Sequence, residues 1–179
     1  MLTRLIVLPL CCVIMLLTFG SASNAEQAIA PVNTENTVLK RLLKRADSHI
    51  QQAQYEQALE LLNKAYENSD NLEDQSIRND ALNSMANVYY NTGQLEQAYR
   101  YYTELVELDK ANNDKSALSV SLFNLGHVNA SRKQFSKADK NFKASLKISR
   151  QLADDVGIAS TLKAMGVNAQ AQSKLNTAK

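Results

Sequence analysis

Apolar residues recur at helical spacing along most of the chain. Leu82, Met85, Ala86 and Tyr89 lie at positions i, i+3, i+4 and i+7, which places their side chains on one face of an α-helix. The polar segment 91–93 interrupts this stripe, and a second stripe follows it. The second stripe consists of Leu95, Ala98, Tyr102 and Leu105. The pattern predicts two amphipathic helices joined by a short turn.

The same pair of stripes recurs 40 residues later, so that Ala86 corresponds to Gly126. Two helices that cross at about 8–10 Å leave room only for a small residue at the closest point. The small residues in this frame are Ala46, Ala86, Gly126 and Gly166 in the first helix, and Ala58, Ala98, Ala138 and Ala178 in the second. The repeat predicts units at about 38–77, 78–117 and 118–157, and a partial unit at 158–179.

These positions resemble the tetratricopeptide repeat, whose pattern is large-x2-Leu-Gly-x2-Tyr followed by Ala-x3-Phe. The residues that match it are Leu82, Met85, Ala86, Tyr89, Ala98 and Tyr102, then Leu122, Leu125, Gly126, Ala138 and Phe142. The usual unit has about 34 residues, so the longer period is similar to an extended subclass of the family. The resemblance implies an all-α fold, a right-handed superhelical α-solenoid of about three and a half repeats.

The partial fourth unit has two interpretations. Its first helix, at about 155–173, becomes polar toward its end, as expected of the capping helix that a solenoid needs. Alternatively, the natural chain continues with more repeats, or with a membrane span and a signalling domain. The linkers between units contain Asn and Asp, which we expect to cap the helices that follow. These linkers are 68–71, 112–114 and 154–155.

The N-terminal segment 1–25 has the character of a signal peptide. Arg4 precedes an apolar run from Leu5 to Phe19, which is shorter than the ~20 residues of a membrane-spanning helix. Small residues at Ser23 and Ala25 predict cleavage before residue 26, and an uncleaved anchor is the alternative. We expect an exported, periplasmic bacterial protein in which 26–37 form a flexible leader to the first helix.

The composition argues against catalysis and against a cofactor. Both cysteines, Cys11 and Cys12, lie in the leader, so the mature chain has no thiol for chemistry or metal binding. The two histidines, His49 and His127, lie in different repeats and lack metal-ligand spacing. The formal net charge is +2, which provides no general field for nucleic acid. The sequence therefore predicts no enzyme, no metal, no cofactor and no nucleic-acid partner.

The resemblance implies that the first helices line a concave groove that binds a peptide or a partner helix. Matching the family pattern residue by residue, together with two neighbouring Asn, gives Asn83, Asn87, Tyr90, Asn91, Phe123, Asn124, His127 and Lys163 as groove residues. We expect the Asn side chains to hydrogen-bond a peptide backbone and the aromatic side chains to anchor it. The predicted function is an exported interaction scaffold or adaptor. The alternative is the periplasmic sensory segment of a larger signal transducer.

A stripe of basic residues follows the second helix of the third unit. Its members are Lys137, Lys140, Lys143, Lys147 and Arg150. One interpretation is a solvated outer face, because an outer helix is polar on one side. The other is a contact for an acidic partner or for an anionic lipid surface, with any membrane contact transient. Salt sensitivity would separate the two.

Overall fold

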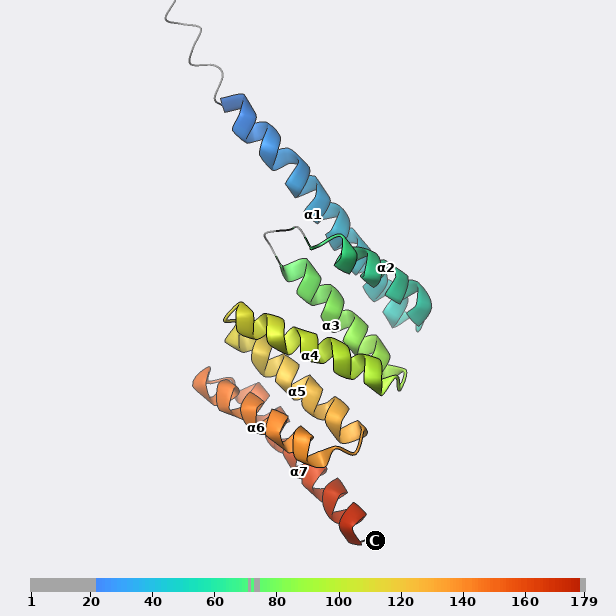
Figure 1. Cartoon of the computed structure of the whole chain (residues 1–179), viewed down its shortest axis with the longest axis vertical. Helices are drawn as coiled ribbons and strands as arrows, with labels where there is room; N and C mark the ends of the chain where they lie inside the picture. The colour runs from blue at the N-terminus through green and yellow to red at the C-terminus, as the bar shows by residue number, and fades with distance from the viewer. Residues whose placement is uncertain (1–21, 71, 73–74, 178–179) are drawn as a thin grey trace, which may run out of the picture. The chain divides into compact units, whose positions relative to one another are not determined.

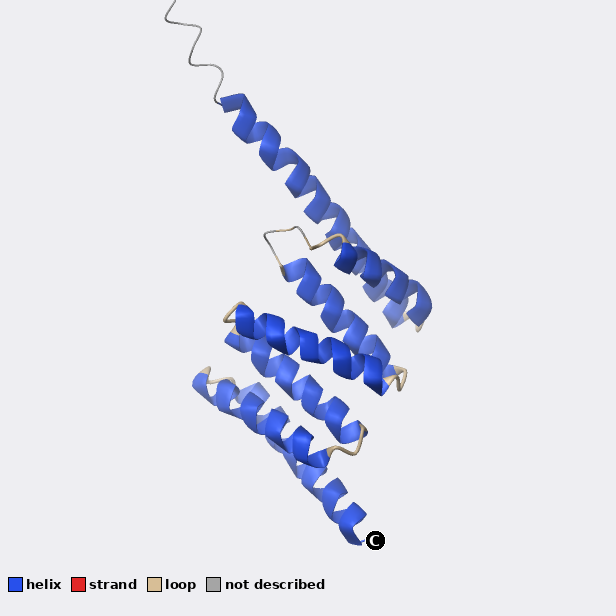
Figure 2. Cartoon of the chain, viewed as in Figure 1, coloured by secondary structure: helices blue, strands red, loops and turns tan. Residues whose placement is uncertain are grey.

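The computed structural model describes residues 22–70, 72 and 75–177, and all regular secondary structure in this part is helical (Figures 1 and 2). The helices are α1 (Ala22–Gln51), α2 (Tyr55–Glu67), α3 (Ser76–Asn91), α4 (Leu95–Ala111), α5 (Lys115–Ser131), α6 (Phe135–Gln151) and α7 (Asp155–Thr177). The chain divides into two compact units, Met1–Val38 and Leu39–Lys179. The helical repeats lie in the second unit.

The segment expected to be a loose leader is helical. Helix α1 begins at Ala22, so that residues 26–37, which we expected to form a flexible leader, lie within it. These residues contain no glycine and one proline, Pro31, while their Ala, Gln and Glu favour a helix. Most of the predicted signal peptide, residues 1–21, lies outside the described residues. Within the described ranges, no helix combines the length and the apolar character of a membrane span.

The second unit is built from helix-turn-helix repeats that stack in sequence order (Figure 1). The second helices of the repeats begin at Tyr55, Leu95 and Phe135, 40 residues apart. Each helix from α2 to α6 packs against the next one in the chain, and α5 also contacts α7. This fold is an all-α solenoid, and one of its core clusters spans several repeats because each repeat covers the face of its neighbour.

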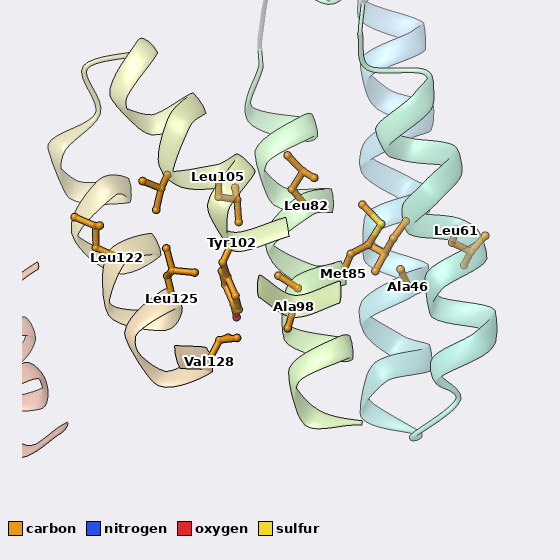
Figure 3. Close-up of a cluster of buried hydrophobic side chains, with 13 residues drawn as sticks. Ala46, Leu61, Leu82, Met85, Ala98, Tyr102, Leu105, Leu122, Leu125 and Val128 are labelled. Atoms are coloured by element: carbon orange, nitrogen blue, oxygen red, sulfur yellow. The ribbon is translucent and has the colours of Figure 1, made fainter. Parts of the chain in front are cut away.

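The core runs from the end of α1 through α5 (Figure 3). The small residues predicted at the crossings are completely buried at Ala46, Ala86, Ala58, Ala98 and Ala138. Larger side chains fill the space around them, among them Leu82, Met85, Tyr102, Leu105 and Leu125. The predicted crossing positions therefore lie where neighbouring helices approach most closely in the first three repeats.

The crossing in the third repeat requires glycine. A Cβ atom placed on Gly126 would lie 2.5 Å from Cε1 and 2.6 Å from Cδ1 of Phe142. Real Cβ atoms do not approach carbon so closely, so the ring of Phe142 occupies the space that a side chain at this position would need. The second repeat has Ala86 and Tyr102 at the corresponding positions.

The turns that follow α1, α3, α4, α5 and α6 share one backbone conformation. The residue two positions after α1, α3 and α5 has a positive φ, at Ala53, Gly93 and Lys133 respectively, and Asn113 and Ala153 have it after α4 and α6. This left-handed conformation costs a non-glycine residue about 1–2 kcal/mol. The repeated turn returns each helix against the one before it, and the packed core offsets the strain at the four positions that lack glycine.

Helix capping was predicted correctly in two of the three linkers. Asp114 Oδ1 accepts a hydrogen bond from the Ala117 amide at 2.9 Å, and Asp154 Oδ1 accepts one from the Gly157 amide at 3.0 Å. In the first linker, Asn68 instead donates its side-chain N–H to the Lys64 carbonyl, at the end of α2. Asp70 forms an ion pair with Arg78. The N-cap residue of α3 is Gln75, and its side chain does not bond to the helix.

Candidate functional site

One face of the second unit carries two pockets, and we call it the inner face. It is formed by side chains of the first helices of successive repeats, α3, α5 and α7. The larger pocket, named the apolar pocket, has a volume of about 530 Å³ and lies between α5 and α7, with α6 behind it. Its principal lining residues are Tyr90, Phe123, His127, Phe142, Lys163, Val167 and Asn168.

Three rings pack together in the apolar pocket. The ring centroids of Phe123 and His127 are 4.6 Å apart with an interplanar angle of 79°, and those of His127 and Phe142 are 5.3 Å apart at 78°. The Phe123 and Phe142 centroids are 6.0 Å apart. Edge-to-face contacts of this kind stabilise an aromatic cluster beyond the area that it buries. The pocket therefore has an aromatic wall.

The histidine of this cluster favours its neutral form. Burial among the rings lowers the pKa of His127 below its ordinary value, because an imidazolium ion would lose hydration there. At neutral pH the ring is an uncharged, weakly polar part of the wall. Lys163, at an exposed position on α7, is the one Lys or Arg among the residues that line this pocket.

An unused hydrogen-bond acceptor lies in the apolar pocket. Asn168 is only 4% exposed, and its Nδ2 donates to the Phe135 carbonyl at 3.0 Å. Its Oδ1 is buried and has no hydrogen-bond partner. A buried acceptor without a partner costs about 1–3 kcal/mol, so a ligand that donates a hydrogen bond there would recover part of that free energy.

The second pocket of the inner face, named the acidic pocket, lies between α3 and α5 and has a volume of about 350 Å³. Three carboxylates line it, and no Lys, Arg or His does. Asp80 and Asp114 are exposed at this pocket. Its lining consists of Asn79, Asp80, Asn83, Leu105, Asp109, Asp114, Ser116, Ala117, Val120 and Ser121.

Asp109 is a buried acid in the last turn of α4. Its side chain is 1% exposed, and its Oδ2 accepts a hydrogen bond from Ser121 Oγ at 2.7 Å. Burial raises the pKa of Asp109; the Ser121 hydrogen bond opposes this rise and the charge of Asp114 adds to it. The carboxylate also lies at the negative end of a helix dipole, which disfavours its charge. A cation in the acidic pocket would stabilise the ionised form.

The structure brings five of the predicted groove residues to the two pockets. Tyr90, Phe123, His127 and Lys163 line the apolar pocket, and Asn83 lines the acidic pocket. Tyr90 also lies within hydrogen-bond distance of Ser131, with 3.3 Å between the two hydroxyl oxygens. The predicted aromatic residues and Lys163 thus gather at the apolar pocket, and Asn83 lies at the other pocket of the same face.

The other three predicted groove residues line neither pocket. The Tyr102 hydroxyl donates to Asn87 Oδ1 at 2.5 Å, so the acceptor expected to meet a peptide bonds to a core tyrosine instead. Asn91 is exposed at the end of α3, and Asn124 is half-buried on α5.

Sequence reasoning missed the residues that define the chemistry of the pockets. The sequence pattern identifies Phe142 only as a match to the second helix of the repeat, and Asp114 only as a helix cap. Asn168 and Asp109 carried no signal, because the pattern of one chain does not show which polar residues become buried. Asp80 lies three residues before Asn83 on α3, and that spacing could have placed it on the inner face.

The basic stripe lies on α6 and is exposed to solvent along its length. Lys143 Nζ is 2.7 Å from Asp139 Oδ2, one turn earlier on the same helix. The members of the stripe line neither pocket. An exposed pair of this kind contributes less than about 1 kcal/mol to stability. The stripe is separate from the inner-face site.

Comparison with known proteins locates the family signal in the central repeats. Residues 77–151 match the family model described as "Tetratricopeptide repeat". The match supports a tetratricopeptide-repeat assignment for these residues, which make up less than half of the chain. The match extends from α3 to the end of α6, which includes the acidic pocket and the α5–α6 side of the apolar pocket. No curated protein matches the chain.

Solved structures share the fold. One of them is the crystal structure of BtubC (BKLC) from P. vanneervenii, with a TM-score of 0.66 and 17% sequence identity. The match covers 82% of this chain and 66% of that one. At this identity the likeness concerns the fold of the tetratricopeptide repeats and not the side chains of the two pockets.

Proposed function

We propose that this protein is an interaction scaffold that binds a segment of a partner protein along its inner face, without catalysis of its own. Tetratricopeptide repeats generally mediate contacts between proteins, and the proposal assigns that role to one surface of this chain. The observation that carries it is the apolar pocket, a hollow of about 530 Å³ with an aromatic wall. Concave, mostly apolar hollows with a few polar groups are the usual form of a binding site.

Apolar side chains on the inner face support this assignment. Val120 is 55% exposed and Val167 is 60% exposed, and both lie at pockets on this face. Tyr90 and Phe123 are half-buried beside them. Apolar surface that gathers around a hollow and is rimmed by polar groups is typical of interaction sites.

Site-specific photocrosslinking in the native cell tests the proposal. A benzoylphenylalanine at Tyr90 or Val167 should crosslink to the partner, because both positions line the apolar pocket. The matched positions are Lys140 and Lys147 on the basic stripe, which are exposed and line neither pocket. Crosslinks from the stripe positions alone would show that the partner binds the outer helix and would overturn the assignment.

We further propose that the protein is exported, on the basis of the apolar run from Leu5 to Phe19 and the small residues that follow it. N-terminal sequencing of protein from the cell envelope should give a chain that begins at or near Glu26. A membrane-bound species that retains Met1 would identify the segment as an anchor. Recovery of the full chain from the cytoplasm would refute export.

A further inference from the structure

The two pockets of the inner face have opposite chemistry. Three aspartates and no cationic side chain line the acidic pocket. The apolar pocket has Lys163 and no carboxylate among its lining residues. Both pockets share α5, so a single extended segment that lies along this helix reaches both.

The acidic pocket has the form required by a long basic side chain. Leu105 and Val120 supply apolar surface beside the carboxylates. Lysine and arginine bury their aliphatic stems on such surface while their charged ends meet acceptors. Asp114 and Asp109 lie at this pocket, the first exposed and the second buried. Asn79 adds a buried Oδ1 that has no hydrogen-bond partner.

The apolar pocket suits a bulky apolar side chain together with its own backbone. The rings of Phe123 and Phe142 supply the wall, and Asn168 Oδ1 is a buried acceptor without a partner. A backbone N–H of the bound segment can donate to that oxygen only after the side chains that cover it move, because the atom is buried. Lys163 disfavours a second cation here, so charge alone assigns the basic residue of the ligand to the acidic pocket.

We propose that the bound segment is an extended peptide that places a Lys or Arg side chain in the acidic pocket and a bulky apolar side chain in the apolar pocket. This inference rests on the proposed function, and it specifies the chemistry of the partner. The partner of the inner face is then a basic and apolar segment of a protein, and neither an acidic peptide nor a lipid.

The geometry of α5 sets the spacing of the two anchors. The acidic pocket uses residues 116–121 of this helix, and the apolar pocket uses residues between 123 and 131. The centres of these two sets are about nine residues apart, which is ~14 Å along a helix. An extended chain covers ~3.3–3.6 Å per residue, so the two anchors lie at least about four residues apart in the ligand.

The experiment uses the purified protein and synthetic peptides with a fluorescent label, measured by anisotropy. The probe is a blocked peptide of about ten residues, with one Lys and one Phe about five positions apart on a Gly-Ser background, made in both orders. Control peptides replace Lys by Glu or Phe by Ser. One order of the probe should bind, each control should bind at least about tenfold more weakly, and added salt should weaken the binding.

Protein variants assign each anchor to its pocket. Asp80→Asn with Asp114→Asn removes two charges, and Asn preserves the helix cap of α5. This pair should weaken binding of the Lys-Phe peptide about tenfold and should not weaken the Glu-Phe control. Val167→Ser should weaken both about threefold. The matched variant is Glu107→Gln, an exposed acid on α4 outside both pockets, and it should leave the affinity unchanged.

Two results would overturn the inference. If neither order binds at about 1 mM peptide, the pockets do not recognise this pair of side chains. If the Glu-Phe peptide binds as tightly as the Lys-Phe peptide, the acidic pocket does not distinguish a basic from an acidic side chain. In either case, photocrosslinks from Tyr90 and Val167 would still support the inner face as the partner surface, so the two proposals fail independently.

Discussion

The central repeats and helix α7 carry the same sequence pattern and differ in what covers it. Leu82 and Leu122 are buried in α3 and α5, whereas Leu162, at the same position of α7, is 46% exposed. A Cβ at Gly126 would meet the Phe142 ring, and one at Gly166 would meet nothing within 4 Å. The first helix of a repeat thus presents an apolar face that becomes core only where a second helix lies on it.

This difference shows that the repeat pattern specifies which face of a helix is apolar. Whether that face is buried depends on the next helix along the chain. Met165 and Ala164 of α7 pack against the cluster around Phe142, so one side of α7 is anchored. The opposite side, with Leu162 and Gly166, is exposed. Substitutions at matched positions therefore separate the contribution of the pattern from that of its neighbours.

Removal of the leucine side chain should give the largest contrast. Leu82→Ala empties a completely buried position between helices and should lower the free energy of unfolding by about 2–5 kcal/mol. Leu162→Ala should cost less than about 1 kcal/mol, because much of that side chain already contacts water. Chemical denaturation measures both. Equal losses would mean that a further element covers α7 in solution.

A methyl group added at the crossing glycine should change stability in opposite directions in the two regions. Gly126→Ala forces the Phe142 ring to move and should destabilise the protein by about 1–3 kcal/mol. Gly166→Ala meets open space within a helix and should stabilise it by up to about 1 kcal/mol. Thermal unfolding followed by circular dichroism decides the signs. Destabilisation by Gly166→Ala would show that another chain approaches this face.

The buried acid of the central repeats should be replaceable with a gain in stability. Because burial raises the pKa of Asp109, the folded state binds a proton more readily than the unfolded state does. Stability is therefore lost as the pH rises from about 4, the unfolded pKa, through the raised folded pKa. Asp109→Asn keeps an acceptor for Ser121 and should stabilise the protein at pH 7, which is measured as a higher Tm.

The pH dependence of the stabilisation by Asp109→Asn provides an internal control. The difference in Tm between Asp109→Asn and the wild type should disappear as the pH falls toward about 4, where the unfolded carboxyl also becomes protonated. Asp155→Asn, an exposed acid in the first turn of α7, should change Tm little at either pH. A lower Tm for Asp109→Asn at pH 7 would show that the carboxylate charge is stabilising.

The smallest effect should come from the histidine at the boundary of the two regions. The pKa of His127 is lowered in the folded state, so the unfolded state binds the proton more readily in acid. Its contribution to stability is complete above about pH 6.5 and is lost as the pH falls below that value, by less than about 1 kcal/mol. His127→Gln should weaken the dependence of Tm on pH between 7.5 and 5.5.

The fold was predictable from sequence wherever a position repeats. Ala86, Ala98 and Ala138 follow the 40-residue repeat, and each lies at a crossing of two helices that has room only for a small side chain. The N-terminal part of α1 was not predictable, because residues 26–37 lack that frame and contain Pro31. Local propensity is a weak guide where no packing pattern accompanies it.

The candidate site was predictable only in part, for a related reason. The inner-face positions of α3, α5 and α7 follow the repeat, and they identified Tyr90, Phe123, His127 and Lys163. The polar groups that give the pockets their character come from other places. Asp109 lies at the end of a second helix, and Asn168 becomes buried only through contact with Phe135. A repeat pattern contains no information about such single contacts.

Packing between sequence neighbours also determines how the molecule comes apart. Because α7 packs closely only against α5 and α6, it should open locally before the central helices do. Amide hydrogens of α7 should then exchange with solvent faster than those of α3 and α4. The apolar pocket has walls on α5, α6 and α7, so a peptide bound there would contact all three helices and oppose the opening of α7. Binding of the peptide should therefore slow the exchange of the amide hydrogens of α7 with solvent.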